Sequence, residues 1–482
     1  MTTTATRDDA PVSVRPESGA GAVRWSPLEL LPSLLVLLLG ITLLLPGHGL
    51  WFDELFTAEV GRRPLGEILA AIVEGRGTAS YLAGVPPSYN APYYVVVHLW
   101  MSLPGLGGDT SLRMLSLLAV AGGLALVTRA VARLSGRATG VLAGLVLATS
   151  PLLLEQAVEA RSYGLAVLAT GGAALGLVRW LQEPPRGLLL FGIAGAGMGL
   201  AHWYAVTTLA AFVVAALVLR RRRALPVVAV GTAAALPTAL MVGLNLLNGT
   251  GGRNAEHLHD TGGRLVGLAV EAWAAASPPL LYLTVGLVVL GGSRATGVRV
   301  LGLSWVLVPL LLLVAAELIR PVYLPRYLLT GLLGLGVLAA AGAMSAPRAA
   351  RTPIAALLVA CSLLAAGPLF DRGPRERSDD VVRELAELQR PGEPIVAADQ
   401  RSATGLDHYV RLLEPHLRPD VVLPPDDAPA DATRVWLVRR LFDGAPEPTD
   451  DDEILRSAGL SMTRQYDFPA TKTDLVLQLW ER

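Results

Sequence analysis

The sequence predicts an all-α polytopic membrane protein of about eleven transmembrane helices with a small α/β domain at its C-terminal end. Three observations predict this class. Hydrophobic residues make up 52% of the 482-residue chain, and the mean hydropathy of +0.49 is too high for a water-soluble protein of this length. Apolar segments long enough to cross a hydrocarbon core of ~30 Å recur between residues 28 and 370. After residue 370 the composition becomes polar, proline-rich and charged.

The first element is a polar segment, residues 1–27, which we expect to be a disordered cytoplasmic tail. A secretory signal is disfavoured because no A-x-A cleavage site follows the first apolar run. Residues 28–370 form the predicted transmembrane module. Its predicted spans are 28–46, 111–133, 139–157, 161–181, 187–201, 203–220, 224–246, 274–292, 298–319, 324–345 and 352–370.

Arginines set the predicted orientation of these spans. Arginine clusters follow every second span, so all of them fall on one side of the membrane. By the positive-inside rule that side is cytoplasmic, which places the N-terminus inside and the C-terminus outside a plasma membrane. Acidic residues gather in the opposite loops. The cytoplasmic-side arginines are Arg129, Arg133, Arg137, Arg179, Arg186, Arg220 to Arg223, Arg294, Arg299, Arg348 and Arg351.

The first outer loop, residues 47–110, opens with LWFDELFTAEVG, in which Asp53 and Glu54 stand among large apolar side chains. Residues 91–103 are apolar but short, which favours an interfacial or re-entrant segment over a twelfth crossing. This segment belongs to SYNAPYYVVVHLW, which brings Asn90, Tyr93 and Tyr94 together as candidate substrate contacts. Anchoring of the tyrosines at the level of the lipid headgroups is the alternative.

The carboxylate pair suggests acid–base chemistry. A carboxylate at the mouth of a membrane helix suits a general base for a hydroxyl group. The structural alternative is that Asp53 is the N-cap of a short helix beginning at Glu54. Neighbouring side chains on a helix point ~100° apart, so both acids cannot face one small substrate. We predict Asp53 as the catalytic base, with Glu54 supporting it or binding a metal.

Several arginines lie on the acidic side, where the orientation does not need them. Arg161, in EARSYG, and Arg326, in LPRYLL, are predicted to bind a phosphate because a guanidinium matches phosphate oxygens. Arg113, at the start of the second span, is a further candidate for a contact with the substrate. For Arg161 and Arg326 the alternative is an arginine that reaches the interface from a helix end. His202, in AHWYA, is either a packed histidine or a substrate contact.

The sequence requires no cofactor. Glu54, His257 and His259 are candidate ligands of a divalent metal, with a solvated loop as the alternative for the HLHD sequence at residues 257–260. The single cysteine, Cys361, excludes an intrachain disulfide. The balance of 40 basic and 40 acidic residues gives no indication of nucleic-acid binding. No GxxxxGK[ST] sequence is present, so a P-loop ATPase is excluded.

Residues 371–482 are predicted to form the extracytoplasmic α/β domain. Helix-like segments at 381–389 and 452–460 alternate with strand-like segments at 394–398, 434–440 and 474–480. The dominance of alanine, arginine and glycine in the whole chain indicates a GC-rich bacterial genome.

Taken in order, the outer motifs resemble the GT-C membrane glycosyltransferases. An Asp-Glu pair after the first span is followed by a Pro-Tyr-Tyr segment, an arginine in SLRMLSLLAV, an EARSY loop, a His-aromatic loop and a late PRYLL. The resemblance is to the bacterial protein-mannosyltransferase-like group that also contains the lipid A aminoarabinose transferases. It covers residues 28–345 and implies a GT-C fold. It implies nothing for the C-terminal domain.

The resemblance also implies roles for individual residues. Asp53 activates the acceptor hydroxyl, with Glu54 as its partner. Two departures from the family pattern are an Asn-Ala-Pro start where His-Pro-Pro is usual, and Ser162 in place of a loop proline. The residues implied to bind the donor phosphate are Arg161, Arg326, Tyr163 and Tyr327. Those implied to contact the substrates are Asn90, Tyr93, Tyr94, Arg113 and His202.

The predicted function is transfer of a sugar from a polyprenyl-phosphate donor to an acceptor hydroxyl on the outer face of the membrane, with inversion. Nucleotide sugars stay in the cytosol, so a transferase facing outward needs a donor already carried by a membrane lipid. A hexosyltransferase using mannose is the first candidate, with arabinose and aminoarabinose as other sugars. The acceptor is a glycan, a lipid or a protein. The alternatives are a transporter or flippase, disfavoured because the charges cluster on one side, and a non-catalytic adaptor.

Overall fold

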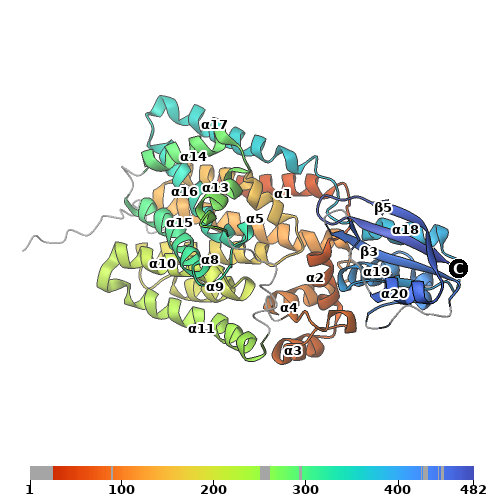
Figure 1. Ribbon diagram of the computed structural model, residues 1–482. Coiled ribbons are helices and arrows are strands. Elements are labelled where there is room, and N and C mark those ends of the chain that lie inside the picture. Colours follow the sequence, from red (N-terminus) through yellow and green to blue (C-terminus); the bar gives the residue numbers. More distant parts are fainter. Residues whose placement is uncertain are drawn as a thin grey trace, which may run out of the picture.

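The computed structural model describes residues 25–87, 91–249, 261–291, 296–424, 426, 432–442, 445–446 and 450–482. Figure 1 shows two parts: a bundle of long helices, and a smaller α/β domain that contains the C-terminus. Three shorter helices of the predicted first outer loop, α2, α3 and α4, lie where the two parts meet. We call this end of the bundle the domain end.

The helices of the bundle and of the first loop follow one another along the chain as the sequence predicts. In chain order they are α1 (Leu31–Leu44), α2 (Phe52–Arg62), α3 (Leu65–Glu74), α4 (Ala91–Met101), α5 (Asp109–Ser135), α6 (Arg137–Ala148), α7 (Pro151–Ala157), α8 (Tyr163–Gln182), α9 (Leu188–Ala201), α10 (Ala205–Arg220), α11 (Leu225–Leu247), α13 (Leu265–Ala274), α14 (Pro278–Gly291), α15 (Thr296–Glu317), α16 (Leu329–Ser345) and α17 (Arg348–Ala365).

Each predicted span coincides with a helix or with part of a bent helix pair. Among the described residues, seven helices are long and apolar enough to cross a membrane, or nine if each bent pair forms one span. The pairs are α6–α7, bent by 67°, and α13–α14, bent by 107°. Helices α10 and α11 enter this count as one stretch, although the chain turns between them at Arg221, whose φ is 48°. The fold class is confirmed, and the number of crossings stays a prediction.

The sequence misplaces two features of the bundle. Helix α13 precedes the predicted span 274–292, because a sharp bend splits one apolar stretch into two helices. Arg129 counts among the arginines expected on the cytoplasmic side, but it lies within α5, which continues to Ser135, and it is buried there. The Arg129 guanidinium lies 2.7 Å from a carboxylate oxygen of Glu29, which is also buried. A charge removed from water needs such a partner, and this pair holds the start of the first span against α5.

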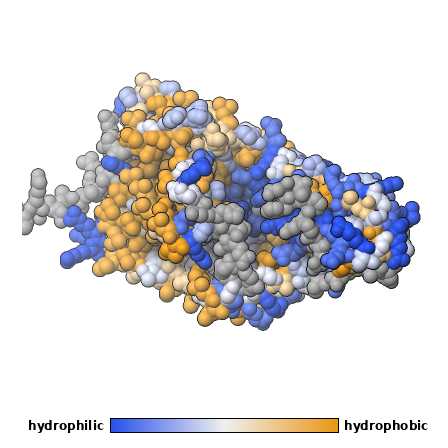
Figure 2. Space-filling model, in the orientation of Figure 1, coloured by the Kyte–Doolittle hydropathy of each residue, from blue (hydrophilic) through white to orange (hydrophobic). Residues whose placement is uncertain are grey.

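The bundle exposes apolar side chains to its surroundings. Figure 2 shows hydrophobic atoms over the bundle and hydrophilic atoms over the domain. Large exposed hydrophobic residues occur on helices throughout the bundle, far more than a water-soluble monomer tolerates. They include Leu38, Leu189, Leu240, Leu311 and Leu364. The protein is therefore a multi-pass membrane protein whose lipid-facing surface is the bundle.

Close helix packing within the bundle depends on small residues. Gly342 of α16 faces the backbone of α14, and a Cβ atom added there would lie 1.9 Å from the carbonyl oxygen of Leu287. Backbones that approach this closely are typical of helix pairs in membranes, where small residues allow contact.

We expect Gly342→Ala to destabilise the bundle by about 1–3 kcal/mol, because α14 and α16 must move apart to admit the methyl group. Thermal unfolding of the purified protein in detergent measures this change. Gly286→Ala is the matched control, since Gly286 lies in α14 with nothing within 4 Å of its added Cβ. Equal unfolding temperatures for the two variants would contradict the proposed packing.

The C-terminal domain is built on a mixed sheet. Its helices are α18 (Ser378–Leu388), α19 (Gln400–Leu412) and α20 (Asp450–Ser457), and its strands are β1 (Ile395–Ala397), β2 (Val421–Val422), β3 (Arg434–Phe442), β4 (Ala445–Pro446), β5 (Ser461–Phe468) and β6 (Leu475–Glu481). The strand order is β2-β1-β3-β6-β5, with β4 paired to β3. Strand β1 is parallel to β2 and β3, whereas β6 is antiparallel to β3 and β5.

The alternation of side chains along β3 places the domain helices. Trp436 and Val438 share a core with residues of α18 and α19, while Val435 and Leu437 on the opposite face share one with Leu455 of α20. This alternation is what period-2 side chains in a strand require. All three strand-like and both helix-like segments of the sequence are confirmed, whereas α19 and β5 were not predicted.

The first loop and the domain share one hydrophobic core. Leu55 of α2 and Val97 of α4 belong to the same buried cluster as Leu406 of α19. Polar contacts reinforce this junction: Tyr409 donates from its hydroxyl to Asp109 at 2.7 Å, and the Leu50 N–H donates to that hydroxyl at 2.6 Å. The domain therefore fixes the position of α2, the helix that carries the predicted carboxylate pair.

Candidate active site

Asp53 lies in the first turn of α2 at the domain end of the bundle. Its carboxylate oxygen Oδ2 lies 3.5 Å from Nη2 of Arg161 and 3.6 Å from Nη2 of Arg326. The structure thus brings together three predicted site residues that are far apart in the sequence. The N-cap of α2 is Trp51, so the alternative that Asp53 serves as the N-cap is wrong.

The charges around Asp53 favour its ionised form. Burial raises the pKa of Asp53, but the positive charges of Arg161, Arg326, Lys472 and Arg401 outweigh burial and hold this pKa below its usual value. With about a fifth of its side chain exposed, the carboxylate remains reachable from outside. Asp53 is therefore an accessible anion in a positively charged setting.

Glu54 faces away from this site, as expected for its neighbour on a helix. Its side chain is buried and accepts hydrogen bonds from Arg113 Nε at 2.9 Å and Arg113 Nη2 at 2.5 Å. It also accepts from the backbone N–H groups of Ala160 at 2.8 Å and Trp51 at 3.4 Å. These donors occupy both carboxylate oxygens, so the geometry fits an anchoring role for Glu54 better than metal binding or catalysis.

Arg113 is engaged by the same network. Besides Glu54, its guanidinium donates to the carbonyl oxygens of His48 at 2.6 Å and Gly49 at 2.9 Å. The start of α5 is thereby tied to the chain that leads into α2. The structure places Arg113 beside the site as a connector between these elements, where the sequence predicted a substrate contact.

Two turns position the phosphate-binding candidates. Arg161 lies between α7 and α8, where Ser116 of α5 donates to its carbonyl oxygen at 2.9 Å and its own Nη1 donates to the carbonyl oxygen of Asp53 at 3.2 Å. Arg326 lies in a short 3-10 helix, Pro325–Leu328, that precedes α16. Pro325 supplies the fixed φ that suits the first turn of such a helix. Both arginines are thus held by backbone geometry at a helix start.

An aromatic cluster supports these arginines. The ring of His202 lies 4.9 Å from that of Tyr163 and 5.2 Å from that of Tyr327, and Tyr204 stacks on Tyr327 at 4.5 Å. Burial, with Arg161 and Arg326 nearby, lowers the pKa of His202 to about 3, so its imidazole is neutral. Tyr163, Tyr327 and His202 therefore gather beside the arginines as the sequence predicts, within one packed cluster.

The tyrosines of α4 are buried behind α2. Tyr94 contacts Phe56 edge to face at 5.8 Å, and Tyr93 lies 5.6 Å from Tyr94. At eleven residues, α4 is about 16 Å long, which fits the predicted interfacial or re-entrant segment better than a membrane crossing. Tyr94 therefore supports the helix that carries Asp53, and Tyr93 packs beside Tyr94.

Three predicted site residues, Asn90, His257 and His259, lie outside the described residues. Within the part of the chain that the structure describes, no group of three or more His, Cys, Asp and Glu side chains is arranged to hold a metal ion.

Sequence reasoning missed the contribution of the domain. Lys472, in the turn between β5 and β6, places its Nζ 3.4 Å from the centroid of the Trp51 ring. Arg401 of α19 lies 4.7 Å from the ring centroid of Phe52. Glu376, in the chain between bundle and domain, accepts from the Phe52 N–H at 3.2 Å. Burial raises the pKa of Glu376 to about 7. The composition did hold one signal, since Lys472 is the only lysine of the chain.

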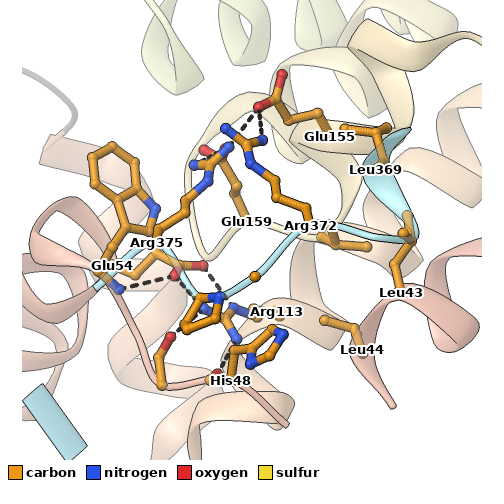
Figure 3. A pocket seen from close by; sticks show the side chains of 15 residues that line it. Leu43, Leu44, His48, Glu54, Arg113, Glu155, Glu159, Leu369, Arg372 and Arg375 are labelled. Carbon is orange, nitrogen blue, oxygen red and sulfur yellow. Dashed lines mark hydrogen bonds and ion pairs between the residues drawn. The ribbon is translucent and has the colours of Figure 1, made fainter. Parts of the chain in front are cut away.

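A cavity adjoins the site on the side of Glu54. Figure 3 shows Arg372 and Arg375 converging on Glu155, opposite the Glu54–Arg113 pair. The cavity has a volume of about 100 Å³ and opens to solvent. Its lining includes Trp51, Leu43 and Leu44 at the end of α1, and Leu369 shortly after α17, but not Asp53, Arg161 or Arg326. The cavity therefore lies next to the Asp53 carboxylate and does not enclose it.

The fold is similar to that of ArnT from Cupriavidus metallidurans. The crystal structure of ArnT bound to undecaprenyl phosphate matches with a TM-score of 0.58 at 14% sequence identity, covering 95% of this chain and 98% of ArnT. The apo structure matches with a TM-score of 0.53 at 14% identity, covering 93% and 97%. No protein-family model and no curated protein matches the sequence. The predicted GT-C fold is confirmed.

Proposed function

We propose that this protein is a membrane glycosyltransferase that moves a sugar from a polyprenyl-phosphate donor to an acceptor hydroxyl. The observation that carries the proposal is the position of Asp53, whose carboxylate lies within 3.6 Å of both Arg161 and Arg326. This arrangement supplies a base and two phosphate-binding cations at one point. The fold likeness to ArnT bound to undecaprenyl phosphate supports a lipid-linked donor.

In the proposed reaction, the acceptor oxygen attacks the anomeric carbon of the donor sugar. The new carbon–oxygen bond forms as the bond from this carbon to the phosphate oxygen breaks, and that electron pair stays on the phosphate. The proton of the acceptor hydroxyl passes to Asp53. A single displacement of this kind inverts the anomeric carbon. The products are the glycosylated acceptor and the polyprenyl phosphate.

The arginines have two effects in this scheme. The phosphate gains negative charge as it leaves, and guanidinium groups placed to meet that charge lower the barrier. In the resting site the same guanidinium groups hold the pKa of Asp53 down, which weakens it as a base. A bound donor phosphate compensates their charge, so we expect the basicity of Asp53 to rise when the donor is in place.

The direction of the site follows from the predicted orientation. The domain end carries Asp53 and lies away from the arginine-rich turn of Arg220 to Arg223 between α10 and α11. With that turn in the cytoplasm, the N-terminus is cytoplasmic and the domain and site face outward. An outward site needs a donor carried across the membrane by its lipid. The sugar is a hexose or a pentose, with mannose the first to test.

A transfer assay with reconstituted protein tests the proposal. Undecaprenyl phosphates carrying radiolabelled mannose, arabinose or aminoarabinose would be supplied separately, with cell-envelope glycans, lipids and proteins as acceptors. Protein-dependent movement of label to an acceptor, with release of undecaprenyl phosphate, is the expected result. No transfer from any donor, together with movement of intact donor between leaflets, would favour a flippase instead.

Replacement of Arg326 should slow sugar transfer, because this arginine is proposed to bind the donor phosphate. We expect Arg326→Gln to lower kcat/KM for the lipid donor on the order of 100-fold, because one cation facing the leaving charge is lost. Steady-state transfer rates at varied donor concentration measure the change. Arg320→Gln is the matched control, since Arg320 lies exposed in the segment that connects α15 to the turn of Arg326. Equal losses in both variants would argue against a specific phosphate contact.

A further inference from the structure

The turn between β5 and β6 brings the C-terminal domain to the candidate active site. Its backbone is fixed to the chain that leaves the bundle: the Thr471 N–H donates to the carbonyl oxygen of Pro374 at 2.9 Å. The N–H groups of Lys472 and Thr473 donate to the carbonyl oxygen of Arg375 at 3.2 and 3.0 Å. Three hydrogen bonds thus hold the only lysine of the chain in a defined place.

The ammonium of Lys472 lies over Trp51, two residues before Asp53 in the sequence. Its Nζ is 3.4 Å from the ring centroid, a cation–π contact that orients the side chain. The residue as a whole is exposed, while its ammonium end packs on the Trp51 ring and is partly buried there. The charge of Lys472 acts on Asp53, and the charges of Asp53 and Arg326 act on Lys472. The ammonium therefore lies beside Trp51, near enough to the Asp53 carboxylate and to Arg326 for their charges to influence one another.

Positive charge exceeds negative charge in this space. Arg161 and Arg326 share the single carboxylate of Asp53. Over the ranges that the structure describes, no carboxylate forms an ion pair with Lys472. Glu159, the next acid, pairs instead with Arg375. An ammonium without a counter-ion, on an exposed residue near two arginines that share one carboxylate, is suited to an anion from outside the protein.

We propose that Lys472 binds the phosphate of the polyprenyl lipid together with Arg161 and Arg326, so that the C-terminal domain completes the site. This inference rests on the proposed function. A third cation would stabilise the leaving phosphate, because the phosphate acquires a second negative charge when its bond to the sugar breaks. Lys472 approaches from the domain, whereas the two arginines belong to the bundle, so the phosphate is held between the two parts of the molecule.

The pH dependence of transfer should reveal this contact. Burial, together with the positive charges of Arg326 and Arg375, lowers the pKa of Lys472 to about 8, against the opposing effect of Asp53 and Glu159. Lys472 is charged below this pKa and loses its charge as the pH rises through it. We expect kcat/KM for the donor in the wild type to fall as the pH rises above about 8. In Lys472→Arg this fall should be absent, since a guanidinium keeps its charge.

The single lysine allows a direct test that does not depend on activity. The full-length protein in nanodiscs would be treated with an amine-acylating reagent, and modification of residue 472 would be quantified by peptide mass spectrometry. The additions are undecaprenyl phosphate, the uncharged alcohol undecaprenol, and inorganic phosphate. The Lys472→Arg variant, which has no lysine, serves as the control: label that remains in it lies on other amines. Binding of undecaprenyl phosphate is measured on the same samples.

The expected result is that undecaprenyl phosphate slows acylation of Lys472 at least several-fold while undecaprenol does not. Slowing by inorganic phosphate as well would support the same subsite with the phosphate group alone as the ligand. Equal slowing by undecaprenol would overturn the proposal, because the lipid chain and not the phosphate would be responsible. Unchanged acylation despite measured binding would overturn it while leaving the glycosyltransferase proposal intact. Failure of undecaprenyl phosphate to bind at all would count against both.

Kinetics of Lys472→Met provide a second measurement. We expect a loss in kcat/KM for the donor on the order of 100-fold, largely restored in Lys472→Arg. A structural role for the lysine stem over Trp51 would give the opposite pattern, with the methionine variant active and the arginine variant no better.

Discussion

Asp53→Asn should abolish nearly all sugar transfer while leaving donor binding intact. A positioned general base contributes a factor of about 10²–10⁴ to a rate, and asparagine cannot accept the acceptor proton. The substitution also removes the anion that Arg161 and Arg326 share. Their charges then become fully available to the phosphate, so we expect undecaprenyl phosphate to bind at least as tightly. Single-turnover transfer rates and equilibrium binding of the lipid measure the two effects separately.

Asp371→Asn is the matched control for this substitution. Asp371 is an exposed acid in the chain that links the bundle to the domain, and its replacement should leave the rate unchanged. If Asp53→Asn transferred sugar at the rate of the control, Asp53 would not be the base. Weaker lipid binding in Asp53→Asn would mean that the carboxylate organises the arginines rather than competing with the phosphate.

The second large effect is expected in stability. Removing either partner of the Glu54–Arg113 pair should cost about 3–5 kcal/mol, because it leaves a buried charge without a counter-ion. Glu54 is 1% exposed and Arg113 only 13%, so solvent does little to screen the loss. Unfolding of Glu54→Gln and Arg113→Met in detergent, followed by denaturant titration, measures the change.

The double variant Glu54→Gln with Arg113→Met completes the cycle. We expect it to be more stable than the sum of the single losses predicts, because neither charge is then left unpaired. The exposed pair Glu74–Arg76 is the matched control, since such pairs contribute about 0–1 kcal/mol. Stable single variants without transfer activity would contradict the anchoring role and restore Glu54 as a catalytic residue.

The network of Glu54 explains why two adjacent acids have different tasks. Asp53 points to two arginines, Arg161 between α7 and α8 and Arg326 at the start of α16. Glu54 points to Arg113 and to the backbone of Ala160. The role of Asp53 depends on Glu54, because the hydrogen bond from the Ala160 N–H to Glu54 holds the turn that carries Arg161.

The sequence by itself determined the membrane-spanning character and the order of the helices, and it singled out the candidate residues Asp53, Arg161 and Arg326 that the fold brings together. Hydropathy over span-length segments reports directly on the environment of a helix, so these predictions need no knowledge of partners. Asp53, Arg161 and Arg326 were visible because each is a charge that is out of place in its segment. The strand-like and helix-like segments of the domain could also be predicted, because the periodicity of a strand or helix is a local property of the sequence.

The tertiary structure alone decided which side chains meet. Neither the pairing of Arg113 with Glu54 nor the burial of Arg129 against Glu29 can be read from spacing, because the partners lie 59 and 100 residues apart. The position of Lys472 beside Trp51 depends on how the domain packs on α2. That packing is fixed by a hydrophobic core shared between distant segments of the chain. Periodicity records whether a side chain is buried, but only packing determines what it is buried against.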